Sequence, residues 1–176
     1  QLVCFALTFP IPDRLREKTW IYCPDEGSVF YRITPFSIFS SAHTPDPNRF
    51  CSFLCEVATP GGTPMHPDSE LAARVLGDLR QSGLLEFEPE QAHVFHLNAD
   101  YGYPIPTLDR DDALNNILPA LEAQHIYSRG RFGAWKYEVG NMDHSIIQGV
   151  EAVDHILGGK PEITYLDPAV VNSRKQ

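Results

Sequence analysis

The stretch RGRFGAWKYEVGNMDHS, residues 129–145, combines cationic, aromatic and tight-turn residues within a short length of chain. Arg129 and Arg131 are two residues apart, so both side chains would point to the same face of an extended segment. Gly130 and Gly133 permit close approach of the backbone, and guanidinium groups match phosphate oxygens in bidentate geometry. The stretch therefore favours a site for a diphosphate.

The second half of the same stretch predicts a turn followed by the start of a helix. Tyr137 would add a hydroxyl donor close to the arginines. Gly140 and Asn141 permit a turn from which residues 142–145 enter the helix. The free N–H groups of such a helix start stabilise an anion or an electron-rich carbonyl edge. A structural loop with surface arginines and a capped helix is the alternative interpretation.

The elements that must position these residues are strands in the first half of the chain and helices that follow. Strand patterns cover residues 1–9, 19–23, 29–39, 50–58 and 92–98. The first three segments indicate an antiparallel meander. Helical spacing of apolar residues follows Asp68, which is a candidate N-cap, and ends at Gly83; a second helix begins at Asp109.

A third helix follows the opening stretch. Its apolar stripe consists of Ile146, Ile147, Val150, Val153 and Leu157, and Gly158 and Gly159 close it. The order of strands and helices predicts an α+β fold with a mostly antiparallel sheet backed by helices. We expect one part over residues 1–126 and a C-terminal segment over residues 127–176.

Composition excludes several classes of function. The net charge of −9 argues against a nucleic-acid partner, because affinity for nucleic acids depends on lysines and arginines that neutralise phosphates. No apolar run approaches the roughly 20 residues of a membrane span, and no basic-then-apolar leader is present. These features predict a soluble, cytoplasmic protein that does not bind membranes.

The cysteines do not follow a metal-binding or redox pattern. They are Cys4, Cys23, Cys51 and Cys55, and they lie in strand-like stretches. We expect reduced thiols in the core and no metal site. A zinc site that joined two of them to His93 and His96 is the alternative, although these spacings differ from the usual zinc frameworks.

The chain opens on QLVCFALTF, an apolar stretch of strand character without an initiating methionine. Such a stretch belongs inside a sheet. We therefore expect the chain to be the later part of a longer protein.

Several segments resemble, in the right order, the flavin-dependent UDP-galactopyranose mutases of the eukaryotic type, within the flavin amine-oxidase-like superfamily. The most specific segment is YSRGRFGAWKYEVGNMDHSIIQGVEAVD at 127–154. The other segments are KTWIYCPDEGSVFYR at 18–32, YGYPIPTLDRDDALNNILPAL at 101–121 and EITYLDPAVVN at 162–172. The resemblance spans nearly the whole chain and is weaker from about residue 40 to 90.

The resemblance implies a role for each matched residue. Arg32 and Arg131 would be the catalytic arginines that hold the diphosphate of a UDP-sugar. Tyr22, Tyr103 and Tyr137 would donate hydroxyl hydrogen bonds to the same phosphates, and Trp20 is a candidate platform for the substrate. Asn141 would lie beside sugar, phosphate and flavin. The flavin-facing set would comprise Arg131, Gly140, Asn141, Met142 and Ser145.

The resemblance also implies a cofactor, FAD, which acts in its reduced form without net redox change. The chain has no G-x-G-x-x-G fingerprint, so an FAD-binding half would have to come from elsewhere. We expect this chain to bind flavin poorly alone and to associate with an FAD-domain partner or to form a homo-oligomer. Its small-molecule substrate would be a UDP-sugar, and its reaction an isomerisation.

Two other functions remain open on the sequence alone. Met142 stands where the mutases are expected to carry glutamine, which leaves room for an FAD-dependent oxidoreductase of the same superfamily. A non-catalytic module that docks on a flavoprotein is the third hypothesis. At single residues, Arg32 would otherwise form a structural ion pair with Glu56 or Asp25, and His144 would pack or cap the helix.

Overall fold

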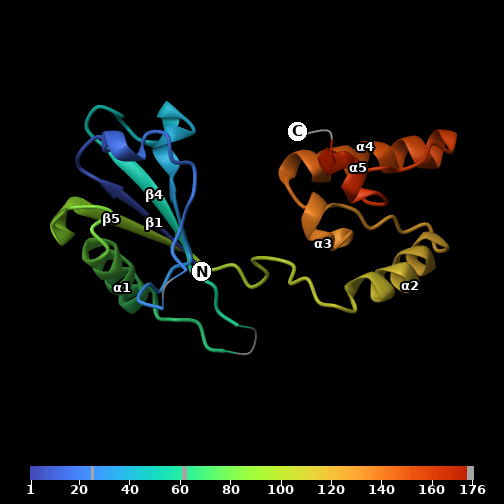
Figure 1. The fold of residues 1–176 in the computed structure, drawn as a ribbon, viewed down its shortest axis with the longest axis horizontal. Coiled ribbons are helices and arrows are strands. Elements are labelled where there is room, and N and C mark those ends of the chain that lie inside the picture. The colour runs from blue at the N-terminus through green and yellow to red at the C-terminus, as the bar shows by residue number, and fades with distance from the viewer. Residues whose placement is uncertain (25, 61–62, 174–176) are drawn as a thin grey trace. The chain divides into compact units, whose positions relative to one another are not determined.

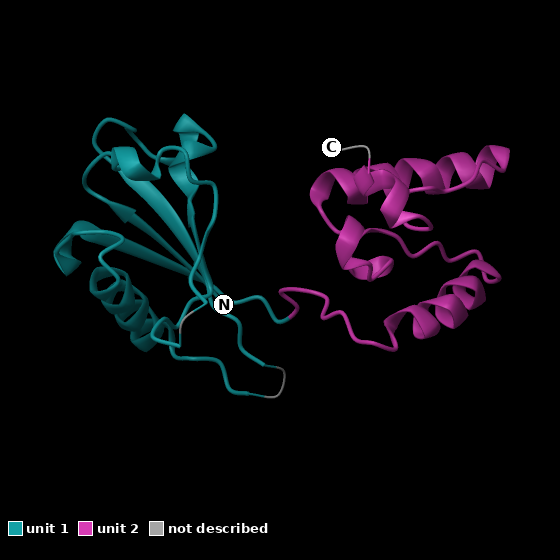
Figure 2. Ribbon diagram, viewed as in Figure 1, with its two compact units in different colours: residues 1–100 teal, residues 101–176 magenta. Residues whose placement is uncertain are grey.

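The computed structural model describes residues 1–24, 26–60 and 63–173, which divide into two compact units. Unit 1 covers residues 1–100 and unit 2 covers residues 101–176 (Figure 2). The boundary expected from the sequence, between residues 126 and 127, falls inside unit 2. The helix before that position belongs with unit 2, because its Leu114 and Leu118 share a buried cluster with Ala134 and Tyr165.

Unit 1 is an antiparallel sheet backed by a helix (Figure 1). Among the described residues the sheet has the strand order β2-β3-β4-β1-β5. The strands are β1 (Leu2–Leu7), β2 (Ile21–Tyr22), β3 (Arg32–Pro35), β4 (Cys51–Glu56) and β5 (Ala92–Leu97). The predicted α+β fold is confirmed. The predicted meander is wrong, because β1 pairs with β4 and β5 and not with β2.

The core of unit 1 lies between one face of the sheet and helix α1 (Asp68–Gln81). Alternate residues of β1 and β4 face this core, and the register places Phe5 opposite Phe53, with ring centroids 5.3 Å apart. Helix α1 contributes Leu71, Val75 and Leu79 from one side, as its spacing predicts. The opposite face of the sheet carries the residues that alternate with these, among them Arg32 and Glu56.

Unit 2 is helical. It contains α2 (Arg110–Glu122), the short α3 (Gly130–Gly133), α4 (Met142–Gly158) and α5 (Pro168–Ser173). Asp109 is the N-cap of α2 and Gly159 ends α4 in a left-handed conformation, both as predicted. Over the described residues, no helix has the length and apolar character that crossing a membrane requires.

The apolar stripe of α4 does not face the core of unit 2. Its five members are all exposed, with Ile146 at 70% and Leu157 at 82%. A stripe of this kind normally packs on a core. The buried side of α4 instead consists of His144, Gln148 and Ala152. The helix therefore meets its own unit through polar and small side chains.

In the described part of the chain none of the four cysteines forms a disulfide, and Cys51 and Cys55 are buried. Burial raises the pKa of the Cys51 thiol to about 12 and that of Cys55 well above its ordinary value. Within the ranges that the structure describes, no group of three or more His, Cys, Asp or Glu side chains is placed to hold a metal ion.

Candidate anion-binding site

The stretch after Arg129 is not extended. Gly130, with a φ of +83°, begins the single helical turn α3, and a 3-10 turn over Tyr137–Val139 leads to the start of α4. Residues two apart point in different directions on a helix. The predicted fork of Arg129 and Arg131 is therefore wrong, and the two arginines have separate surroundings.

Arg129 is a structural residue of unit 2. Its guanidinium donates to the carboxylates of Glu122 and Glu162, at 2.6 Å in each case, and lies 4.1 Å from the ring centroid of Tyr165. Its side chain is only 5% exposed. Burial would lower the pKa of Arg129, yet the hydrogen bonds that it donates to Glu162 and Glu122 raise this pKa well above its ordinary value. The charge of Arg129 is thus already matched inside the protein.

Arg131 has different surroundings. Its Nε donates to the carbonyl of Gly140 at 2.7 Å, and its guanidinium carbon lies 5.0 Å from the ring centroid of Tyr103. The ring of Tyr103 meets that of Tyr137 edge to face, with centroids 5.5 Å apart. Across the described residues, Arg131 has no ion pair with a carboxylate. An oriented guanidinium without an internal counter-charge is suited to an anionic ligand.

The start of α4 follows directly. Asn141 is the N-cap and is exposed, and Met142 is 82% exposed. Ser145 donates its backbone N–H to the carbonyl of Asn141 at 2.9 Å and lies beside Gly130. The residues predicted to face a flavin therefore cluster at one helix start, next to Arg131. His144 is buried, in agreement with the packing interpretation.

The second predicted cluster lies in unit 1, on β2, β3 and the segment before β2. The Nε of Arg32 donates to Glu56 at 2.7 Å, and one of its terminal nitrogens donates to the hydroxyl of Tyr22 at 3.3 Å. The guanidinium carbon lies 5.6 Å from the ring centroid of Trp20 and 6.0 Å from that of Tyr31. The structural ion pair with Glu56 is confirmed, and Asp25 lies outside the described residues.

Electrostatics and exposure define what this cluster can do. Burial would lower the pKa of Arg32, but hydrogen bonds with Tyr22 and Glu56 raise it above its ordinary value. Trp20 and Tyr22 are 55% and 61% exposed, so neither is a core residue. The cluster offers an aromatic surface around a cation that shares its charge with one carboxylate. It can contact a planar or anionic group from the open face of the sheet.

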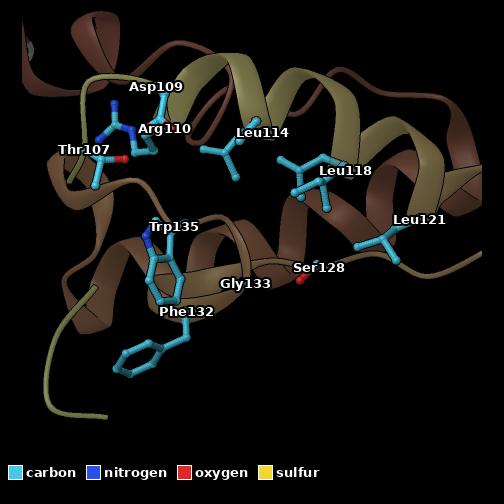
Figure 3. A pocket seen from close by; sticks show the side chains of 12 residues that line it. Thr107, Asp109, Arg110, Leu114, Leu118, Leu121, Ser128, Phe132, Gly133 and Trp135 are labelled. Atoms are coloured by element: carbon cyan, nitrogen blue, oxygen red, sulfur yellow. The ribbon is translucent and has the colours of Figure 1, made fainter. Parts of the chain in front are cut away.

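A pocket of about 410 Å³ lies in unit 2 between α2 and the α3 region. Leu114 and Leu118 point into it from α2, and Phe132 and Trp135 line the other side (Figure 3). At its mouth, Arg110 donates to both carboxylate oxygens of Glu138, at 3.0 and 2.9 Å. The lining is mainly apolar and its cation is already paired, so this pocket is not the place for a diphosphate.

Gln148 is the residue of this region that the sequence analysis missed. It lies in the middle of α4, is fully buried and hydrogen-bonds to the loop that carries Arg131. The signal was a polar residue within an apolar helical pattern, which usually marks the solvated face of a helix. In α4 the arrangement is reversed: the apolar stripe is exposed, and the face that carries Gln148 is buried.

No family model matches the chain. Among solved structures it matches "Crystal structure of reduced UDP-Galactopyranose mutase" with a TM-score of 0.85 and 36% sequence identity. The alignment covers 98% of this chain and 36% of that one, so the chain spans about a third of the length of the mutase. The chain therefore has the fold of part of a UDP-galactopyranose mutase, which points to an isomerase-type relative. At this level the fold agrees with the resemblance seen in the sequence.

Proposed function

We propose that this chain is the substrate-binding and C-terminal portion of a flavin-dependent sugar-nucleotide mutase of the eukaryotic type, which interconverts UDP-galactopyranose and UDP-galactofuranose. The observation that supports this proposal best is Arg131. Its guanidinium is held in place by Gly140 and Tyr103 and lacks a carboxylate partner among the described residues. The 36% sequence identity to a UDP-galactopyranose mutase, over 98% of this chain, supports the same proposal.

In this proposal the chain's own residues bind and hold the diphosphate. Arg131 neutralises its charge while the bond between sugar and phosphate breaks and re-forms, which keeps the leaving group in place for recapture. Tyr103 and Tyr137 supply hydroxyl donors beside it. Within unit 1, Arg32 and Tyr22 offer a guanidinium and a hydroxyl to a UDP-sugar, and Trp20 provides an aromatic surface for it.

FAD fits the start of α4. Asn141 caps the helix without a side-chain hydrogen bond to it, and the exposed Met142 follows, so the first turn is open to a ligand in the described structure. Gly140, Asn141, Met142 and Ser145 would hold the flavin edge together with Arg131. When bound in its reduced form, the flavin supplies the nucleophile for the anomeric carbon. The positive end of the helix dipole stabilises negative charge at that edge.

We also propose that the exposed apolar stripe of α4 contacts an FAD-binding half, supplied in the same protein or by a partner. A contiguous apolar helix face is a common sign of an interface. Self-association through this stripe is the competing outcome. Sedimentation of the chain with and without an FAD-binding half separates them: a mixed complex supports the proposal, and a homodimer that excludes the FAD-binding half contradicts it.

The test is calorimetric titration of UDP and UDP-galactose into the chain joined to the FAD-binding half of a UDP-galactopyranose mutase, with the flavin oxidised and then reduced. We expect UDP to bind and Arg131→Ala to weaken binding by about 2 kcal/mol, or roughly thirtyfold, since a charged hydrogen-bond partner is lost. Arg74→Ala, which removes one exposed arginine from α1, is the matched control. Absence of UDP binding in both redox states would reject the mutase and favour an oxidoreductase relative.

A further inference from the structure

Gln148 occupies a place where a helix normally buries an aliphatic residue. It is on the inner side of α4 and has no exposed surface. Its side-chain oxygen accepts the backbone N–H of Gly130 at 2.9 Å, and its side-chain nitrogen donates to the carbonyl of Val139, also at 2.9 Å. Both polar ends of the amide are therefore paired, as burial of a polar side chain requires.

The two partners of Gln148 flank the contact that orients Arg131. Gly130 directly precedes Arg131 in the chain, and Val139 directly precedes Gly140, whose carbonyl accepts from the Nε of Arg131. The buried amide of Gln148 is thus hydrogen-bonded to both ends of the loop over residues 130–139. The side chain of Arg131 connects the same two ends. Displacement of either end would change the distance between the Nε of Arg131 and its acceptor.

The hydrogen bonds of Gln148 also connect this loop to α4, close to the start of the helix. Gln148 belongs to the same helix as Ser145, and an added Cβ at Gly130 would lie 3.6 Å from the Cβ of Ser145. Gly130 and the first turns of α4 are therefore in close contact. The position of Arg131 and the position of the helix start are set by one packed arrangement, in which Gln148 makes the polar contacts.

We propose that Gln148 is a positioning residue for the anion-binding Arg131, acting through Gly130 and Val139 and without touching the ligand. The proposal deepens the function proposed above and rests on it in one respect, the identity of the anion as a nucleoside diphosphate. The proposal is argued from two hydrogen bonds of Gln148, one to each side of the contact between Arg131 and Gly140. This geometry is independent of the ligand.

The first experiment follows the Nε–H of Arg131 by NMR in the chain without ligand. In the wild type we expect this hydrogen to be protected from exchange, because it is donated to the carbonyl of Gly140. Gln148→Met keeps the length of the side chain but removes both hydrogen bonds, and we expect the protection to fall about tenfold. Thr164→Val is the matched control. It removes a buried hydroxyl that donates to Glu151, at another position of α4, and the protection of the Arg131 Nε–H should be retained.

The second experiment is a double-mutant cycle on UDP affinity in the chain joined to an FAD-binding half. Gln148→Met should weaken UDP binding about tenfold, leave the stoichiometry and uridine binding unchanged, and have no further effect when Arg131 is already alanine. A purely structural role would lower the stoichiometry, or weaken UDP equally in both backgrounds, and would overturn the proposal. Unchanged protection of the Arg131 Nε–H in folded Gln148→Met would overturn it too.

Gln148→Glu provides a rescue. At a pH where the introduced carboxyl is ionised, it accepts from Gly130 but has no hydrogen to donate to Val139, so protection of the Arg131 Nε–H should be reduced. Because burial raises the pKa of such a carboxyl, the measurement extends from neutral into alkaline pH. Protonation at lower pH restores a donor, and protection relative to the wild type at the same pH should recover. Failure to recover contradicts the proposal. If the wild type binds no UDP, the proposed function fails while the Nε–H measurements still decide whether Gln148 positions Arg131.

Discussion

Arg32 in unit 1 and Arg131 in unit 2 present the same guanidinium group beside tyrosine rings, yet they differ in counter-charge. Arg32 lies against the carboxylate of Glu56, which is itself only 15% exposed. Arg131 is anchored by an uncharged carbonyl, that of Gly140. The charge of Arg32 is therefore matched by a carboxylate, whereas Arg131 has no salt bridge to a carboxylate among the described residues. An arginine in a sequence indicates an anion site only when the acids around it are known.

The largest expected effect of a missing counter-charge is on the free energy of unfolding. Arg129, which has two carboxylate partners, is the reference for Arg131. Arg129→Met should reduce the free energy of unfolding by about 3–5 kcal/mol, because it leaves two carboxylates without their cation. Arg131→Met should cost less than about 1 kcal/mol, since no carboxylate depends on it. Urea unfolding followed by circular dichroism measures both. Equal losses would mean that Arg131 is also a structural residue.

A smaller effect should follow from removing the counter-charge of Arg32. Glu56→Gln should tighten UDP binding by about 1 kcal/mol, roughly fivefold, because the guanidinium is no longer neutralised. Calorimetry at low and high salt checks this, with Glu70→Gln on the exposed side of α1 as the control. Weaker binding in Glu56→Gln would show that Glu56 orients Arg32 more than it competes for it.

The aromatic contact of Arg131 should contribute less again. Tyr103→Leu removes the ring beneath the guanidinium and should weaken UDP binding by about 0.5–1 kcal/mol. Tyr103→Phe keeps the ring, so any loss in this variant reports the hydroxyl alone. Titration of both variants separates the two contributions. A loss in Tyr103→Phe as large as that in Tyr103→Leu would rule out the ring as the important contact.

The last effect is zero at neutral pH, where it is the smallest of the four, and concerns the tyrosine stacked on Arg129. Burial raises the pKa of Tyr165 to about 12, whereas an unfolded tyrosine has a pKa of about 10. A raised pKa means stability that is complete below about pH 10 and is lost as pH rises toward 12. The urea midpoint of unit 2 should fall over this interval. Tyr165→Phe should remove this dependence, and an unchanged pH profile in that variant would contradict the assignment.

The fold was predictable where local pattern is sufficient. The start of α2 and the approximate bounds of α1 and α4 follow from apolar spacing and from start and stop signals such as Asp109, Gly83 and Gly159, because these act within one or two turns. The pairing of β1 with β4 and β5 was not predictable, since partners distant in sequence leave no local signal. The direction in which the α4 stripe faces was not predictable for a similar reason. Spacing reveals that a helix has an apolar face but not which face its own unit covers.

The candidate site was predicted in part. Trp20 and Tyr22 lie beside Arg32, and Tyr103 and Gly140 lie beside Arg131, with Tyr137 against Tyr103. That these residues bind a ligand stays a prediction. The two arginines of one stretch could not be told apart, because the partners of Arg129 lie at Glu122 and Glu162, on either side in the sequence. Gln148 was missed because its role depends on backbone groups, which the sequence does not distinguish.

Two glycines of the Arg131 loop restrict which sequences can carry this site. Gly130 requires its left-handed φ, and a Cβ at Gly133 would lie 3.0 Å from the backbone carbon of Ser128. Other residues at these positions would strain the loop or displace it. Related chains that lost either glycine should also have lost the geometry of the arginine between them. The spacing of glycine, arginine and glycine is therefore a practical mark for separating relatives that keep the site from those that keep only the fold.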